Sequence, residues 1–226
     1  YNFKKQGTLS HYNISSIKNK PGLLTKALFD ADVFITTRWP NKNIITTKLK
    51  LIQIPAAGYD NIHFESVPKG CIVSNTFEHE IPMAEYCLLA MLESEIHLNK
   101  MDIQLKKGDW TGYFSRTSFH GELYNQNLGI IGFGHIGKEI SKRANAFGMN
   151  ITAIVRDTEK YKKNNKINFI SIKDIKTIIN KIDYLIVACP LNKKTKDMIN
   201  LKLIKQMNKN AIIINIARGP IVNEDD

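Results

Sequence analysis

The pattern of apolar and polar positions divides the chain into short strand-like runs separated by helix-like segments. In its first part, apolar runs begin at Val33, Leu49 and Cys71, and a helix-like stretch covers residues 23–29. Strands that alternate with helical segments predict a parallel sheet, because parallel strands need crossover connections. The first part of the chain is therefore expected to form a small α/β lobe.

A longer helical pattern runs from residue 81 to about residue 106. Apolar residues recur there at helical spacing, Pro82 stands in the first turn, and Gly108 ends the pattern. A long helix between two α/β regions can link two lobes, so we place the boundary along it. The expected domains are a substrate lobe over residues 1–95 and a second lobe over residues 96–226.

After residue 125 the alternation of strands and helices becomes regular. Apolar strands are expected over residues 128–131, 151–155, 167–172, 184–188 and 211–216, and helices over residues 136–147, 174–180 and 201–207. This order makes up most of a doubly wound parallel sheet of the Rossmann type. The expected fold class is α/β, with a Rossmann sheet and a smaller α/β lobe.

A glycine-rich segment joins the first of these strands to its helix. Gly132, Gly134 and Gly137 form a G-x-G-x-x-G pattern between a strand and a helix, which is the context that gives the pattern its meaning. The three glycines permit a tight turn, close approach of the backbone to a diphosphate, and close helix–strand packing. The amides near His135 and Ile136 would face the anion at the helix start. We assign His135 to cofactor binding rather than catalysis.

The end of the second strand of the Rossmann lobe bears on the choice of cofactor. An acid there binds the ribose hydroxyls of NAD, whereas a nearby Arg accommodates the 2′-phosphate of NADP. Arg156 and Asp157 are both present, and Val155 occupies the usual position of the acid. Lysines follow at Lys160 and beyond, so the sequence favours NADP over NAD by a small margin. The alternative is that both residues are only solvated turn residues.

Composition narrows the possible partners and cellular compartment of the protein. The net charge is +11, but only five of the 32 basic residues are Arg, and the lysines are spread along the chain. This favours a compositional bias over a nucleic-acid groove, and no apolar run reaches the length of a membrane span. Three cysteines without CxxC spacing are typical of reduced thiols in a cytoplasmic protein.

Several segments, in order, resemble the D-isomer-specific 2-hydroxyacid dehydrogenase family. They begin at Leu49, Asn75, Leu128, Cys189 and Asn215, and read LKLIQIPAAGYDNI, NTFEHEIPMAE, LGIIGFGHIG, CPLNKKT and NIARGPIVNE. The resemblance implies a Rossmann domain, a flavodoxin-like substrate lobe, and hydride transfer between NAD(P) and C2 of a small D-2-hydroxy or 2-oxo acid. It also implies a homodimer.

The same resemblance assigns residues to the expected site. Arg218 matches the catalytic arginine, whose planar charged fork can hold a carboxylate or polarise a carbonyl. Ala57 and Gly58 match positions whose main-chain amides bind the substrate carboxylate. The cofactor would be bordered at its adenosine part by Pro190 and at its nicotinamide by Ile216 and Ala217.

One part of the family pattern, the acid/base pair, has no counterpart in this sequence. The family uses a His, oriented by a Glu, as its acid/base, and both follow the Arg-Gly segment; none of the six histidines matches that position. Without such a group no side chain transfers the hydroxyl proton. We expect that the chain is a C-terminally truncated piece of an enzyme, inactive by itself. The alternative is a non-catalytic dinucleotide-binding regulatory protein or pseudoenzyme.

Overall fold

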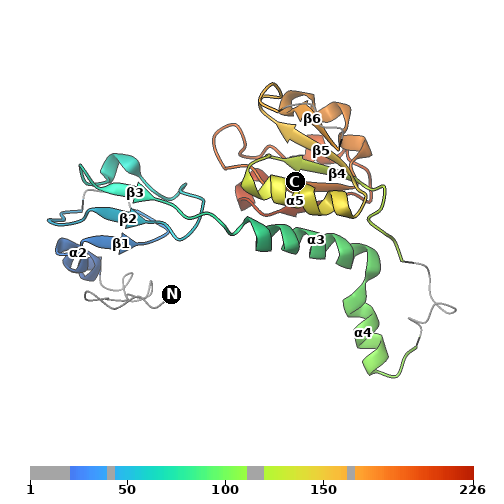
Figure 1. Cartoon of the computed structure of the whole chain (residues 1–226), viewed down its shortest axis with the longest axis horizontal. Coiled ribbons are helices and arrows are strands. Elements are labelled where there is room, and N and C mark those ends of the chain that lie inside the picture. The colour runs from blue at the N-terminus through green and yellow to red at the C-terminus, as the bar shows by residue number, and fades with distance from the viewer. Residues whose placement is uncertain (1–20, 40–43, 111–119, 162–165) are drawn as a thin grey trace. The chain divides into compact units, whose positions relative to one another are not determined.

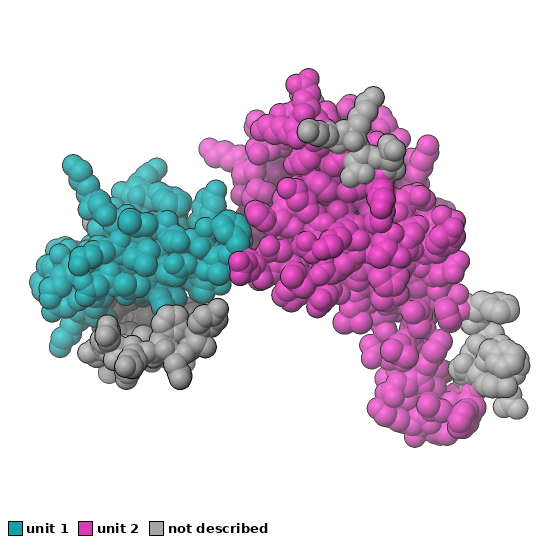
Figure 2. All heavy atoms as spheres, in the orientation of Figure 1, with its two compact units in different colours: residues 1–77 teal, residues 78–226 magenta. Residues whose placement is uncertain are grey.

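The computed structural model describes residues 21–39, 44–110, 120–161 and 166–226. The chain forms two compact units, residues 1–77 and residues 78–226, coloured separately in Figure 2. The domain boundary expected at residues 95 and 96 stays a prediction for the complete protein. In this chain the compact units divide earlier, before the long helix rather than along it.

The first unit is built on a three-stranded parallel sheet with the order β1-β2-β3 (Figure 1). Phe34, Ile52 and Val73 are aligned across it. The buried core around Ile52 includes Leu28 of the preceding helix and Trp39, whose indole donates to the Ser66 carbonyl at 3.0 Å. The elements are α2 (Pro21–Phe29), β1 (Val33–Ile35), β2 (Leu51–Gln53), η1 (Phe64–Ser66) and β3 (Ile72–Ser74).

The second unit contains a five-stranded sheet in which every neighbouring pair is parallel, with the order β6-β5-β4-β7-β8. This is the doubly wound order that the sequence predicts. The elements are α3 (Glu80–Ile96), α4 (Leu98–Lys106), β4 (Asn127–Ile131), α5 (His135–Ala146), β5 (Asn150–Val155), β6 (Ile167–Ser171), η2 (Ile172–Thr177), η3 (Ile179–Lys181), β7 (Tyr184–Val187), α6 (Leu201–Ile204), β8 (Ile212–Asn215) and η4 (Gly219–Ile221).

Both faces of this sheet are covered, which explains why its central strands are apolar at successive positions. Ile130 points to the face where α3 and α5 pack, and its neighbour Ile131 points to the opposite face. All four residues of β7 are buried. Figure 1 shows α3 and α5 together beside the sheet.

A partly buried hydrogen-bond network attaches the end of α3 to the sheet. The Tyr184 hydroxyl donates to the Glu95 carboxylate and lies 3.0 Å from the Ser94 hydroxyl. Burial, and the bond to Glu95, raise the pKa of Tyr184 to about 12. The first part of the helix that the sequence assigns to the region between the lobes, α3, is therefore packed into the second unit.

The long helix expected over residues 81–106 is two helices. His97 separates α3 from α4 with a left-handed backbone (φ 57°), and its amide donates to the Glu93 carbonyl at 2.9 Å. Left-handed residues at helix ends are usually Gly, so a His there leaves the apolar pattern unbroken and gives no signal in the sequence. The helix expected over residues 174–180 is likewise replaced by the 3₁₀ segments η2 and η3.

The described residues include no helix that combines the length and apolar character needed to cross a membrane. All three cysteines are free. Cys87 is fully buried against the sheet, and burial raises the pKa of its thiol to about 12. Cys189 is buried as well, as the sequence predicts, whereas Cys71 is only partly buried.

Candidate functional site

The predicted cofactor residues lie at one edge of the second sheet, in four loops and in the first turn of α5. Because the strands are parallel, their carboxyl ends share this edge. The glycine-rich loop follows β4, residues 156–157 follow β5, Pro190 follows β7, and residues 216–218 follow β8. The strands β4 and β7 are neighbours although they are not consecutive. Their carboxyl ends form the switch point at which open α/β sheets bind nucleotides.

Gly132 makes the turn out of β4. Its φ is +97°, a conformation that side chains disfavour, and its amide donates to the Ile154 carbonyl at 3.0 Å. A Cβ atom here would lie 2.7 Å from the Ala188 carbonyl oxygen. Position 132 therefore requires glycine for two reasons: its own φ disfavours a side chain, and the Ala188 backbone leaves no room for a Cβ atom.

The other two glycines are required for opposite reasons. Gly137 is buried, and a Cβ atom there would collide with the Gly132 carbonyl oxygen, so glycine lets α5 approach the loop. Gly134 is exposed, and among the described residues no atom beyond its two chain neighbours lies within 4 Å of the position of its Cβ. Glycine at 134 therefore keeps space open that the protein itself does not fill.

This open space lies at the start of α5. The N-cap is Gly134, which has no side chain to cap the helix, and the first amides of a helix have no partners within it. Those amides and the helix dipole favour an anion at this point. The residues present fit the diphosphate of a dinucleotide, the group that the glycine pattern predicts.

His135 and Ile136 form the first turn of α5. The side chain of Ile136 packs against the sheet core, whereas His135 is exposed and its Nδ1 lies 4.0 Å from Oε1 of Glu80. Glu80 belongs to the first turn of α3 and is mostly buried. The sequence predicts His135 within the loop, whereas the structure places it at the first position of α5, and the sequence gives no sign of its neighbour Glu80.

An aromatic cluster connects the glycine-rich loop to the segment after β5. Tyr161 stacks on Phe169 with centroids 4.8 Å apart, and both rings meet Phe133 edge-on. The Tyr161 hydroxyl donates to the Phe133 carbonyl at 3.4 Å. The cluster supports Phe133, the residue between Gly132 and Gly134, and the sequence analysis did not identify it.

Arg156 and Asp157 are both exposed directly after β5, but they are placed differently. Asp157 accepts the Glu159 amide at 3.1 Å through Oδ1, and its Oδ2 lies 3.8 Å from Nζ of Lys160. Both carboxylate oxygens thus interact within their own turn. Val155 ends the strand with a buried apolar side chain.

The loop after β7 and the loop after β8 complete the edge. Pro190 is exposed, and its carbonyl accepts the Thr195 hydroxyl at 2.8 Å. Ile216 and Ala217 are half-buried, and the Ile216 amide donates to the Val187 carbonyl at 3.2 Å. The expected adenosine contact, Pro190, and the expected nicotinamide contacts, Ile216 and Ala217, therefore lie in the loops after β7 and β8, beside the switch point.

Arg218 is half-buried three residues after β8. Its Nη1 donates to the Ala217 carbonyl at 2.9 Å. The side chain of Asn215 spans the same turn, donating to the Arg218 carbonyl at 2.9 Å and accepting the Ala217 amide at 3.1 Å. Asn215 thereby fixes the backbone from which Arg218 projects, a role that the sequence analysis missed.

Ala57 and Gly58 lie in the first unit, in the loop that follows β2, and both are half-buried. The Asn75 side chain, which follows β3, donates to the Ala57 carbonyl at 3.0 Å. In the sequence, Asn75 is recognisable only as the first residue of the NTFEHEIPMAE segment.

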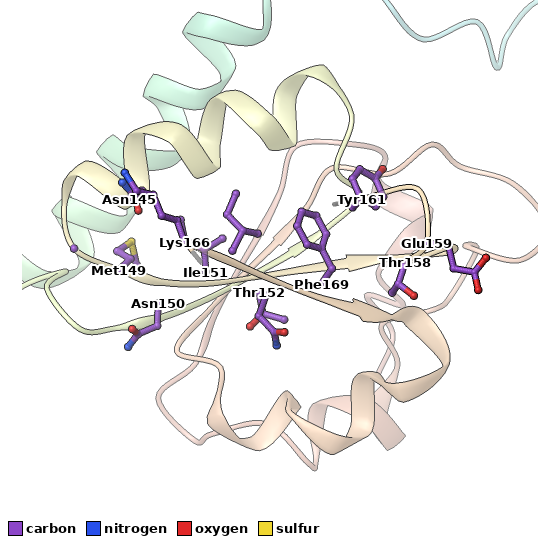
Figure 3. A pocket seen from close by; sticks show the side chains of 13 residues that line it. Asn145, Met149, Asn150, Ile151, Thr152, Thr158, Glu159, Tyr161, Lys166 and Phe169 are labelled. Carbon is purple, nitrogen blue, oxygen red and sulfur yellow. The ribbon is translucent and has the colours of Figure 1, made fainter. Parts of the chain in front are cut away.

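A hollow of about 970 Å³ lies along β5 and β6 and reaches Thr158 and Glu159 in the segment after β5 (Figure 3). Asn150, Thr152 and Lys166 line it, and Tyr161 and Phe169 stand at the end nearer the glycine-rich loop. None of the predicted site residues lines this hollow. Within the described residues, no three His, Cys, Asp or Glu side chains gather as a metal site would require.

The sheet order and the glycine-rich loop define a Rossmann domain of the dinucleotide-binding class. Residues 88–226 match the family described as D-isomer specific 2-hydroxyacid dehydrogenase, NAD binding domain. The chain belongs to this family.

Individual relatives agree with this assignment. The chain is 35% identical over 208 residues to D-3-phosphoglycerate dehydrogenase of Methanocaldococcus jannaschii, covering 89% of this chain and 39% of that protein. It is 33% identical over 182 residues to glyoxylate reductase of Pyrococcus horikoshii, covering 78% of this chain and 54% of that protein. A solved glyoxylate reductase from Paecilomyes thermophila is 26% identical with a TM-score of 0.67, covering 80% of this chain and 54% of its own. The chain thus spans about half or less of the length of these relatives.

Proposed function

We propose that the complete protein transfers a hydride between NAD(P) and C2 of a small D-2-hydroxy or 2-oxo acid. The observation that carries this proposal is the uncapped start of α5, open at Gly134, on the sheet edge from which Arg218 also projects. The bound nicotinamide supplies or accepts the hydride. The names of the relatives, which include glyoxylate and phosphoglycerate enzymes, support this substrate class.

The proposed roles of the side chains follow from their chemistry. Arg218 carries a permanent positive charge in a planar fork, which stabilises the oxygen on which negative charge develops during hydride attack. Ala57 and Gly58 offer main-chain amides to the substrate carboxylate. The reaction also needs a group that moves the hydroxyl proton, and we assign that role to none of the six histidines of this chain.

The assay of this function uses the complete protein with NADH and NADPH and a panel of 2-oxo acids. Oxidation of either cofactor that depends on a small 2-oxo acid is the expected result. Cofactor binding without turnover on any member of the panel would instead favour the non-catalytic alternative. Titration of the cofactor alone does not distinguish the two, because both require binding.

We further propose that NADPH is preferred. The support is the neutral Val155 at the strand end, the exposed Arg156 after it, and the engagement of both Asp157 oxygens within their own turn. An exposed guanidinium at this point can pair with a 2′-phosphate.

Replacing Arg156 with Ala is expected to raise the Kd for NADPH by about 10- to 100-fold, because a hydrogen bond to a charged group is lost. The Kd for NADH should change little. Fluorescence titration with both cofactors measures the effect. Lys181→Ala removes the same charge at the end of η3, before β7 begins, and should leave both Kd values unchanged. Equal losses for the two cofactors would contradict the preference.

We also propose that the protein is a cytoplasmic homodimer that associates through α3 and α4. The free thiols support the compartment. The support for the interface is a series of exposed apolar side chains on these helices and just after them: Tyr86, Leu89, Leu98, Ile103 and Trp110. Exposed apolar side chains favour association because it removes them from water.

Leu89→Glu is therefore expected to shift the protein toward monomer, because it places a charge in the apolar contact. Sedimentation velocity over a range of concentrations measures the shift. Ile45→Glu, at an exposed apolar position of the first unit, is the matched control and should leave the dimer intact. A wild-type protein that is monomeric at every concentration would contradict the proposal.

A further inference from the structure

We infer that Asn75 is a positioning residue that orients the Gly58 amide toward the substrate carboxylate. This inference rests on the proposed function, since it concerns the main-chain site assigned to Ala57 and Gly58. It adds a side chain that neither the family resemblance nor the match over residues 88–226 assigns to the site.

The loop after β2 is held against the segment after β3 by successive hydrogen bonds. The Thr76 amide donates to the Ala56 carbonyl at 3.1 Å, and the Thr76 hydroxyl donates to the Ile54 carbonyl at 2.9 Å. Asn75 acts one residue further along the loop, where its Nδ2 donates to the Ala57 carbonyl at 3.0 Å. A carbonyl oxygen can only accept, so the carboxamide nitrogen must face it.

The position of the Ala57 carbonyl determines the direction of the next amide. A trans peptide is planar, so the N–H of Gly58 points opposite to the carbonyl oxygen of Ala57. With that oxygen held toward Asn75, the Gly58 N–H is directed to the other side of the loop. Within the part of the chain that the structure describes, no hydrogen bond uses the amides of Ala57 or Gly58. These two donors are the ones that the proposed site assigns to the carboxylate.

Asn75 and its neighbour Thr76 hold different parts of the loop. Among the described residues, Thr76 fastens the start of the loop through Ile54 and Ala56, whereas Asn75 holds the peptide plane between Ala57 and Gly58. Asn75 also borders a small hollow beside the loop, together with Tyr59 and Phe64. Loss of Thr76 should loosen the loop, and loss of Asn75 should free one peptide plane to rotate.

The test compares Asn75→Ala with Thr76→Val in the complete protein. Asn75→Ala is expected to raise KM for the 2-oxo acid by about 10- to 100-fold, as expected when a donor to a charged group is misdirected. The Kd for NAD(P)H should stay unchanged. Thr76→Val should lower Tm by about as much as Asn75→Ala does, but it should change KM by less than threefold. Asn75→Asp, which turns the donor into an acceptor, should raise KM at least as much as Asn75→Ala.

A second measurement does not depend on turnover. Oxalate is titrated into ¹⁵N-labelled protein, and the shift of the Gly58 amide resonance is followed in the wild type and in both variants. A large shift in the wild type and in Thr76→Val, with a weakened response in Asn75→Ala, supports the inference. Equal responses in Asn75→Ala and Thr76→Val, or no response in the wild type, would overturn it. A Gly58 response in a protein without turnover would count against the proposed reaction and leave the role of Asn75 supported.

Discussion

Replacing Arg218 with Ala in the complete protein is expected to lower kcat/KM by about two to three orders of magnitude, the usual effect of removing a group that stabilises developing charge. The guanidinium is half-buried, and Asn215 fixes the turn that carries it. The negative charge that Arg218 would stabilise develops in the transition state, so kcat should fall as well as kcat/KM. Steady-state kinetics with the preferred 2-oxo acid measures the change.

Two comparisons make the Arg218 result specific. The Kd for NAD(P)H should stay within about twofold of the wild-type value, since we assign the diphosphate to the start of α5 and the glycine-rich loop. Arg218→Lys keeps the charge but loses the planar fork, so its activity should lie between those of Ala and the wild type. Unchanged turnover in Arg218→Ala would remove this residue from the reaction.

The second large effect is a contrast between two glycines of the same loop. Gly134→Ala is expected to leave the fold as stable as before, because its backbone has an ordinary φ of −82° and the space for a Cβ is empty. The new methyl group should nevertheless obstruct the diphosphate and weaken cofactor binding by at least about tenfold. Gly137→Ala should destabilise the fold itself by about 1–3 kcal/mol, because its Cβ meets the Gly132 carbonyl.

Thermal unfolding and cofactor titration together separate these outcomes. For a chain of this size, the loss at Gly137 corresponds to a fall in Tm of about 2–12 °C. Gly134→Ala should unfold at the wild-type temperature in the absence of cofactor and show a smaller rise in Tm when cofactor is added. A Gly134→Ala protein that binds NAD(P)H normally would place the diphosphate somewhere other than this loop.

The sequence predicts the Rossmann sheet well because its signals are local. Apolar strands, the glycine spacing and the order of βα units determine the β6-β5-β4-β7-β8 arrangement, and the site loops follow from it. The residues that the sequence missed are those whose partners are set by the fold. Asn75 and Tyr161 act across 18 and 28 residues of chain. Asn215 acts on its own turn, but an Asn at a strand end has many possible partners. His97 ends α3 without the Gly that would have marked the end.

The different surroundings of Gly134 and Gly137 have a consequence for how related domains evolve. A Cβ at position 137 would strike the protein's own backbone, so glycine is needed there whether or not a nucleotide binds. At position 134 only a bound nucleotide would be struck. In a lineage that had given up its cofactor, drift should therefore begin at 134 while 132 and 137 persist. A related sequence that keeps glycine at 132 and 137 but has a side chain at 134 would therefore indicate a domain that has kept its fold and lost cofactor binding.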